Sequence, residues 1–144
     1  MAVRRPDHAV TVELDIPFHD CDPLFVVWHG NYFKYLEAGR QALLKSLRLD
    51  IPDMIDLGHR MYIADAHCRY MFPLTYGEKV AVTAWITEPA PLIKVVYDVV
   101  NQTRGRRSAR ASTLLAVTDK AGNLLTEIPD SIFDRLPASN RTSP

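Results

Sequence analysis

The chain has 144 residues, of which 47% are hydrophobic and 24% are charged, which is an ordinary composition for one domain with a single core. Its 17 basic and 17 acidic residues balance, so it lacks the broad positive field typical of nucleic-acid-binding proteins. No apolar run reaches the ~18 residues that a membrane helix requires, and from the polar, charged residues 1–8 we expect no signal peptide. We therefore expect a cytoplasmic protein with neither nucleic acid nor membrane as a partner.

The two cysteines, Cys21 and Cys68, have no metal-ligand spacing around them. In a reducing compartment they are expected to remain free thiols and to behave as small, partly buried hydrophobic residues. The histidines add no ligand spacing with a cysteine or carboxylate. No metal is therefore expected.

In chain order, residues 8–18 come first, and they alternate between apolar and polar side chains, which predicts a half-buried strand. An irregular stretch with Pro23 and Gly30 follows. A helix is predicted from about Asn31 to Leu47, because apolar residues recur there at helical spacing. Gly39 lies near this apolar stripe, so we expect the helix to pack closely against a sheet at that point.

The second half of the chain is rich in Val, Tyr, Thr and Ile, which favours strands at residues 61–72, 79–88, 94–102 and 109–118. Turn-forming residues separate these segments. Residues 50–59 are predicted to form a loop with at most one helical turn, and Ile132, Phe133 and Leu136 a short amphipathic turn near the C-terminus.

This order of elements predicts an α+β protein, in which an antiparallel five-stranded sheet wraps around one central helix. Residues 1–137 are expected to form the single domain, with residues 138–144 as a disordered tail. So small a sheet leaves apolar surface to cover, which favours a homodimer or homotetramer.

The segment richest in chemistry is residues 18–40. Asp20 and Asp22 stand two apart, and in extended chain they would share a face. Pro23 biases Asp22 away from helical geometry and so places it in a loop ahead of the helix. Unpaired N–H groups at a helix start can bind an oxyanion, and a nearby carboxylate can activate water or attack directly. This pairing fits acyl transfer, although an Asp before a helix is more often a simple cap or turn residue.

The same segment resembles the signature of the 4-hydroxybenzoyl-CoA thioesterase-like hotdog family, D-x-D-x-x-G-[IV]-V-[YW]-x-x-x-Y-x-x-[YFW]-[FL]-[ED]-x-[AG]-R. The resemblance implies a hotdog fold and hydrolysis of an acyl-CoA or acyl-carrier-protein thioester. It implies no cofactor, because coenzyme A is part of the substrate. The residues that match without a gap are Asp20, Asp22, Val26, Val27, Trp28, Tyr32, Tyr35, Leu36, Glu37 and Arg40.

By this resemblance, Asp22 is the catalytic carboxylate, acting either as a general base or as a nucleophile. The backbone N–H of His29 would polarise the thioester carbonyl, while the His29 imidazole is more simply explained as a bystander. Glu37 stands where the family keeps an acid facing the acyl pocket, although a helical pair with Arg40 would also explain it.

Four further residues are expected to bind substrate. Asn31 and Tyr32 would hold the loop on the helix, and Trp28 stands between them and the catalytic carboxylate in sequence. Phe25 replaces the glycine that the family usually has. We expect this bulky residue to reshape the acyl pocket or to redirect the loop.

Arg106 and Arg107 follow Gly105 at a predicted hairpin tip. Guanidinium groups bind phosphate well, so these two arginines are candidates for a clamp on the phosphates of coenzyme A. A solvated turn that protects an edge strand would explain the same cluster.

Two other functions stay open at this point. A hotdog hydratase or dehydratase acting on a β-hydroxyacyl thioester needs a histidine and a carboxylate, for which His67 or His29 with Glu37 are the candidates. A non-catalytic acyl-thioester binding protein is the third possibility, and only Phe25 favours it.

Overall fold

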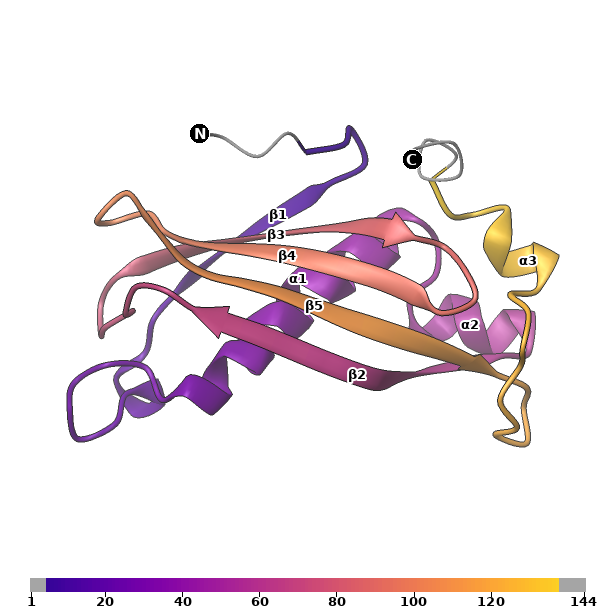
Figure 1. Cartoon of the computed structure of the whole chain (residues 1–144), viewed down its shortest axis with the longest axis horizontal. Coiled ribbons are helices and arrows are strands. Elements are labelled where there is room, and N and C mark those ends of the chain that lie inside the picture. The colour runs from indigo at the N-terminus through magenta and orange to yellow at the C-terminus, as the bar shows by residue number, and fades with distance from the viewer. Residues whose placement is uncertain (1–4, 138–144) are drawn as a thin grey trace.

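The structure is a computed structural model that describes residues 5–137. It consists of one five-stranded antiparallel sheet, ordered β1-β3-β4-β5-β2, with the long helix α1 packed on one face (Figure 1). This confirms the predicted α+β architecture. The bounds are β1 (Val10–Asp15), α1 (Tyr32–Ser46), β2 (Arg60–Tyr70), β3 (Lys79–Glu88), β4 (Ile93–Asn101) and β5 (Arg106–Thr118).

The core lies between α1 and the inner face of the sheet. Tyr35, Leu36 and Leu43 of α1 are buried against alternate residues of the strands. Gly39 lies on the same helix face, and a Cβ atom there would lie 2.8 Å from Val82 Cγ1 on β3. The expected close packing at Gly39 is therefore confirmed.

The connection after α1 differs from the prediction. Residues 50–59 contain the helix α2 (Ile51–Leu57) rather than a loop with one turn. Asp50 and Asp53 form a capping box at its start, and Gly58 ends it in the left-handed region with φ of 79°. The prediction missed this helix because it is short and two of its isoleucines, Ile51 and Ile55, face solvent, which obscures the apolar periodicity.

Smaller differences occur at the sheet and at the C-terminus. β5 begins at Arg106, three residues earlier than expected, so Arg106 and Arg107 lie in a strand and not at the hairpin tip. The predicted C-terminal turn forms α3 (Asp130–Phe133), in which Ile132 is buried. The expected tail, residues 138–144, lies outside the described residues.

β2 forms one edge of the sheet and pairs with β5 alone among the described strands. It runs back toward the start of α1, as Figure 1 shows. Large apolar side chains are exposed along and just beyond this edge, namely Tyr62, Ile63, Tyr70 and Met71. No helix among residues 5–137 is long and apolar enough to cross a membrane.

Candidate active site

Asp22 lies at the base of a tight turn between β1 and α1. Its backbone N–H donates to the Val26 carbonyl over 2.9 Å, and its carbonyl accepts from the Phe25 N–H over 2.9 Å. One carboxylate oxygen, Oδ1, accepts a hydrogen bond from the Leu24 N–H over 2.8 Å. Within the described part of the chain, Oδ2 has no hydrogen-bond partner. The turn therefore orients Asp22, a partly buried residue, and leaves one of its carboxylate oxygens available for chemistry.

Phe25 ends this turn in the left-handed region, with φ of 64°. Glycine adopts that conformation most easily, which gives a backbone reason for the glycine at this place in the family signature. Phe25 is 71% exposed, so its side chain packs little against the rest of the chain.

Backbone and side-chain hydrogen bonds hold the loop against its surroundings. The Asp20 carbonyl accepts from the Trp28 N–H over 3.0 Å and from Asn31 Nδ2 over 2.9 Å. The Val27 N–H donates to the Leu74 carbonyl over 2.8 Å. Asn31 thus ties the loop to the helix start, as the sequence comparison implied, and Asp22 is carried by a rigid segment.

Asp20 does not share a face with Asp22, so this expectation was wrong. The short 3₁₀ helix η1 (Phe18–Asp20) breaks the extended chain and turns Asp20 inward, where it is 3% exposed. Its carboxylate accepts from Lys34 Nζ over 2.5 Å and from the Tyr35 hydroxyl over 2.7 Å. Burial alone would raise the pKa of Asp20, but these two hydrogen bonds and the Lys34 charge hold it below the ordinary value. Asp20 is therefore a structural anchor.

A short 3₁₀ helix, η2 (His29–Asn31), leads directly into α1. Among the described residues, no group accepts a hydrogen bond from the backbone N–H of His29, so this donor is open. The Trp28 ring lies across Gly30 so closely that a Cβ atom there would be 2.3 Å from the ring. The glycine and the tryptophan together give the helix start its shape.

Tyr70, at the end of β2, fastens the helix start to the sheet. Its hydroxyl donates to the His29 carbonyl over 2.7 Å, and its ring meets the Tyr32 ring edge-on at 4.8 Å. Burial raises the pKa of the Tyr70 phenol to about 12, so the hydroxyl remains a donor. The sequence marked Tyr70 only as one of several aromatic residues near a strand end, and nothing in its spacing predicted this contact.

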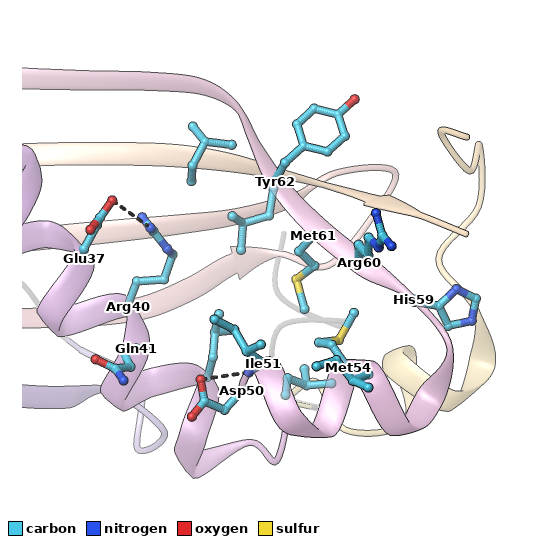
Figure 2. A pocket seen from close by; sticks show the side chains of 15 residues that line it. Glu37, Arg40, Gln41, Asp50, Ile51, Met54, His59, Arg60, Met61 and Tyr62 are labelled. Carbon is cyan, nitrogen blue, oxygen red and sulfur yellow. Dashed lines mark hydrogen bonds and ion pairs between the residues drawn. The ribbon is translucent and has the colours of Figure 1, made fainter. Parts of the chain in front are cut away.

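A cavity of about 780 Å³ lies between α1, α2 and the first half of β2 (Figure 2). Glu37 and Arg40 stand at one end of it, and apolar side chains form most of the remaining wall. Glu37 thus lines a cavity, and its role toward an acyl group stays a prediction. Asp22, Phe25 and Trp28 are not among the residues that line it.

The two candidate clamp arginines have different surroundings. Arg107 donates from Nε and Nη2 to the buried Asp98 over 2.7 and 3.4 Å, and Arg5 reaches the same carboxylate over 2.5 Å. Arg106 is exposed and lies over the Phe72 ring, 4.3 Å from its centroid. Arg106 is thus the more accessible of the two. Residues 5–137 contain no cluster of metal-ligating side chains.

Comparison with known proteins identifies the class to which this fold and site belong. The sequence profile of the Thioesterase-like superfamily matches residues 16–136. The chain is 32% identical over 114 residues to the Bacillus subtilis (strain 168) protein named "Putative acyl-CoA thioesterase YneP", covering 78% of this chain and 82% of the relative.

Solved structures agree on the fold. A DHNA-CoA thioesterase from Staphylococcus aureus superposes with a TM-score of 0.75 at 23% identity, over 82% of this chain and 80% of the other. A variant of 4-hydroxybenzoyl-CoA thioesterase complexed with 4-hydroxybenzoyl-CoA gives a TM-score of 0.79 at 19% identity, over 90% and 99% of the two chains. The chain belongs to the Thioesterase-like superfamily and has the hotdog fold. The prediction of a hydrolase of the thioesterase class is thereby confirmed.

Proposed function

We propose that this protein hydrolyses an acyl-CoA or acyl-carrier-protein thioester to a free acid and a thiol, with Asp22 as the catalytic carboxylate. The observation that carries the proposal is the position of Asp22, on a hydrogen-bonded turn in the segment that leads to the helix start at His29, in a chain of the Thioesterase-like superfamily. The name of the Bacillus subtilis relative supports an acyl-CoA substrate.

Asp22 can act in either of two ways. As a general base, it takes a proton from the water that attacks the thioester carbonyl. As a nucleophile, it displaces the thiolate to form an anhydride, which water then cleaves. In both routes the carbonyl oxygen becomes negatively charged and the sulfur leaves as a thiolate that is then protonated. The His29 N–H, together with the positive end of the helix dipole, would stabilise that oxygen.

The remaining contacts are assigned by position. Trp28 is exposed and Asn31 partly exposed at the helix start, next to the thioester carbonyl in this proposal, whereas Tyr32 is buried and would support the loop from beneath. Glu37 would face the acyl group from the cavity wall. Arg106 is a candidate for a phosphate of coenzyme A, because its charge has no acidic partner among the described residues. Arg107 is a weaker candidate, because Asp98 already occupies its guanidinium.

We further propose that the enzyme is a homodimer or a dimer of dimers, with each site completed at a subunit interface. β2 is 11 residues long and leaves one edge unpaired among the described strands, next to exposed apolar side chains. Such an edge readily pairs with a second copy. The separation of Asp22 from the cavity of its own protomer also supports a shared site. A sedimentation measurement that finds only monomer at micromolar concentration would exclude it.

The position of His67 gives no support to the hydratase or dehydratase alternative. Cys68 packs against the inner core, so its neighbour His67 points to the outer face of the sheet. Glu37 lies on α1 at the inner face, on the other side of the sheet from His67. These two residues are therefore poorly placed to act as acid and base on one substrate.

A thiol-release assay with product mass analysis tests the activity. Wild type should release free thiol from acyl-CoA, and Asp22→Asn should lower kcat by about 10²–10⁴-fold while substrate still binds. Asp15→Asn is the matched control, because it removes an exposed carboxylate outside the site and should keep near wild-type activity. An Asp22→Asn variant as active as wild type would refute the assignment. An intact thioester that changes mass by one water would support the lyase instead.

A further inference from the structure

The cavity beneath β2 has one unusual feature, a half-buried cation in an otherwise largely apolar wall. Buried or half-buried apolar side chains line the cavity: Leu44 of α1, Leu49 just after it, Met54 of α2, Met61 of β2 and Leu115 of β5. In Figure 2, Arg40 extends into this space from α1, beside Glu37. An aliphatic chain suits such walls, but an arginine does not belong there without a polar partner.

Arg40 is only 16% exposed, and its hydrogen bonds within the described part of the chain are few. Nη1 donates to the hydroxyl of Tyr97 over 3.2 Å. That hydroxyl also bonds Thr113 Oγ1 over 2.7 Å, and Tyr97 itself is fully buried. This contact engages only one of the five N–H donors of the guanidinium, and the Arg40 side chain lines the cavity.

Glu37 lies near Arg40 but does not accept a hydrogen bond from its guanidinium. The distance from Arg40 Nη2 to Glu37 Oε1 is 3.9 Å, which is too long for a hydrogen bond, and the Glu37 side chain is 70% exposed. The other charged groups of the wall are engaged or distant: Asp50 caps α2, and Arg60 lies at the far end beside His59 in Figure 2. A strong donor and a strong acceptor thus stand side by side at one end of the cavity.

A hydroxyl group both donates and accepts, so it complements this pair, whereas a plain methylene offers a hydrogen bond to neither residue. We infer that the cavity binds an aliphatic acyl chain that carries a hydroxyl, and that Arg40 is the residue that selects it. The hydroxyl oxygen accepts from Arg40, and its proton is directed to Glu37. This inference rests on the proposed function for the link to a thioester, but the binding preference itself does not depend on hydrolysis.

The test measures binding and turnover separately. Calorimetry compares the binding of decanoyl-CoA, β-hydroxydecanoyl-CoA and ω-hydroxydecanoyl-CoA to the Asp22→Asn variant. Steady-state kinetics then gives kcat/KM for the same three compounds with Asp22 intact. At least one hydroxylated compound should be preferred over decanoyl-CoA by about tenfold or more, because a site built to read a hydroxyl penalises its absence. Arg40→Met should remove most of this preference in both measurements.

Arg60→Met is the matched control, because it removes the same charge from the same cavity at its other end and should leave the preference intact. If Arg40→Met does not fold, Arg40→Lys keeps the charge, loses the planar fork and should still reduce the preference. No preference in wild type, or a preference that survives in every Arg40 variant, overturns the inference. Hydrolysis without a preference refutes only this inference, and a preference without hydrolysis refutes only the proposed function.

Discussion

The backbone N–H of Leu24 donates to Asp22 Oδ1 over 2.8 Å, so the carboxylate proposed for catalysis also holds its own turn together. The two roles can be separated. Asparagine keeps the Oδ1 acceptor, so the free energy of unfolding of Asp22→Asn should lie within about 0.5 kcal/mol of the wild-type value. Alanine removes the acceptor, so Asp22→Ala should be less stable by about 1 kcal/mol. Denaturant unfolding measures both. Equal losses of stability in the two variants would show that the turn does not depend on this hydrogen bond. Hydrolysis should be lost in both variants.

Asp20 should make the fold sensitive to acid. Although burial opposes it, hydrogen bonds from Lys34 and Tyr35 hold the pKa of Asp20 below its ordinary value of 3.8. A carboxyl with a lowered folded-state pKa stabilises the protein above the unfolded-state pKa, because the unfolded chain binds more protons as the pH falls. We therefore expect the free energy of unfolding to decline as the pH falls from about 5 through the lowered folded-state pKa.

The variants Asp20→Asn and Tyr35→Phe test this account. Asp20→Asn should be less stable than wild type at neutral pH, since Lys34 loses its charged partner, and its stability should change less between pH 7 and 3. Tyr35→Phe removes one of the two hydrogen bonds to Asp20, so its stability should be intermediate between those of wild type and Asp20→Asn. Urea unfolding at several pH values gives the comparison, and parallel curves for wild type and Asp20→Asn would contradict it.

The sequence predicted the layout of the fold because its elements carry strong local signals. The alternation in β1, the β-branched runs of β3 and β4 and the helical stripe of α1 each indicate one structure without tertiary information. The short helix α2 was missed because its two isoleucines face solvent and obscure the apolar periodicity, although the spacing of Asp50 and Asp53 was a local capping signal. The short amphipathic turn predicted around Ile132 and Phe133, by contrast, is present as α3, in which Ile132 is buried.

The candidate site was harder to predict. The motif located Asp22 and the helix start, but it could not show that Asp20 turns inward, since that depends on contacts with Lys34 and Tyr35, two adjacent residues of α1 that lie 14 and 15 positions after Asp20 in the sequence. The engagement of Arg107 with Asp98 also depends on the pairing of β4 with β5, which brings residues nine apart into contact. Contacts of this kind follow from strand register and side-chain packing, which a single sequence does not specify.

The two candidate clamp arginines should behave differently when replaced. Arg106→Ala should raise KM for acyl-CoA with kcat nearly unchanged, and the effect should shrink with an acyl-pantetheine that lacks the nucleotide. Arg107→Ala should instead lower thermal stability, because the 3%-exposed side chain of Asp98 loses its bidentate partner. Steady-state kinetics with both substrates and a melting curve separate the two outcomes. A KM effect from Arg107→Ala alone would reverse the assignment.

Phe25 offers the last prediction, because its backbone and its side chain can be tested apart. Its φ of 64° costs any residue with a Cβ roughly 1 kcal/mol, whereas glycine avoids that cost. The exposed ring contributes little packing within the protomer, so Phe25→Ala should be about as stable as wild type, and Phe25→Gly should be more stable than Phe25→Ala by about 1 kcal/mol. Both variants remove the ring. If the ring contacts the acyl group, both should therefore shift the preferred acyl chain toward bulkier ones, and to the same extent, in a thiol-release panel. A shift confined to Phe25→Gly would trace the effect to loop conformation, and wild-type profiles in both variants would show that the ring does not touch the substrate.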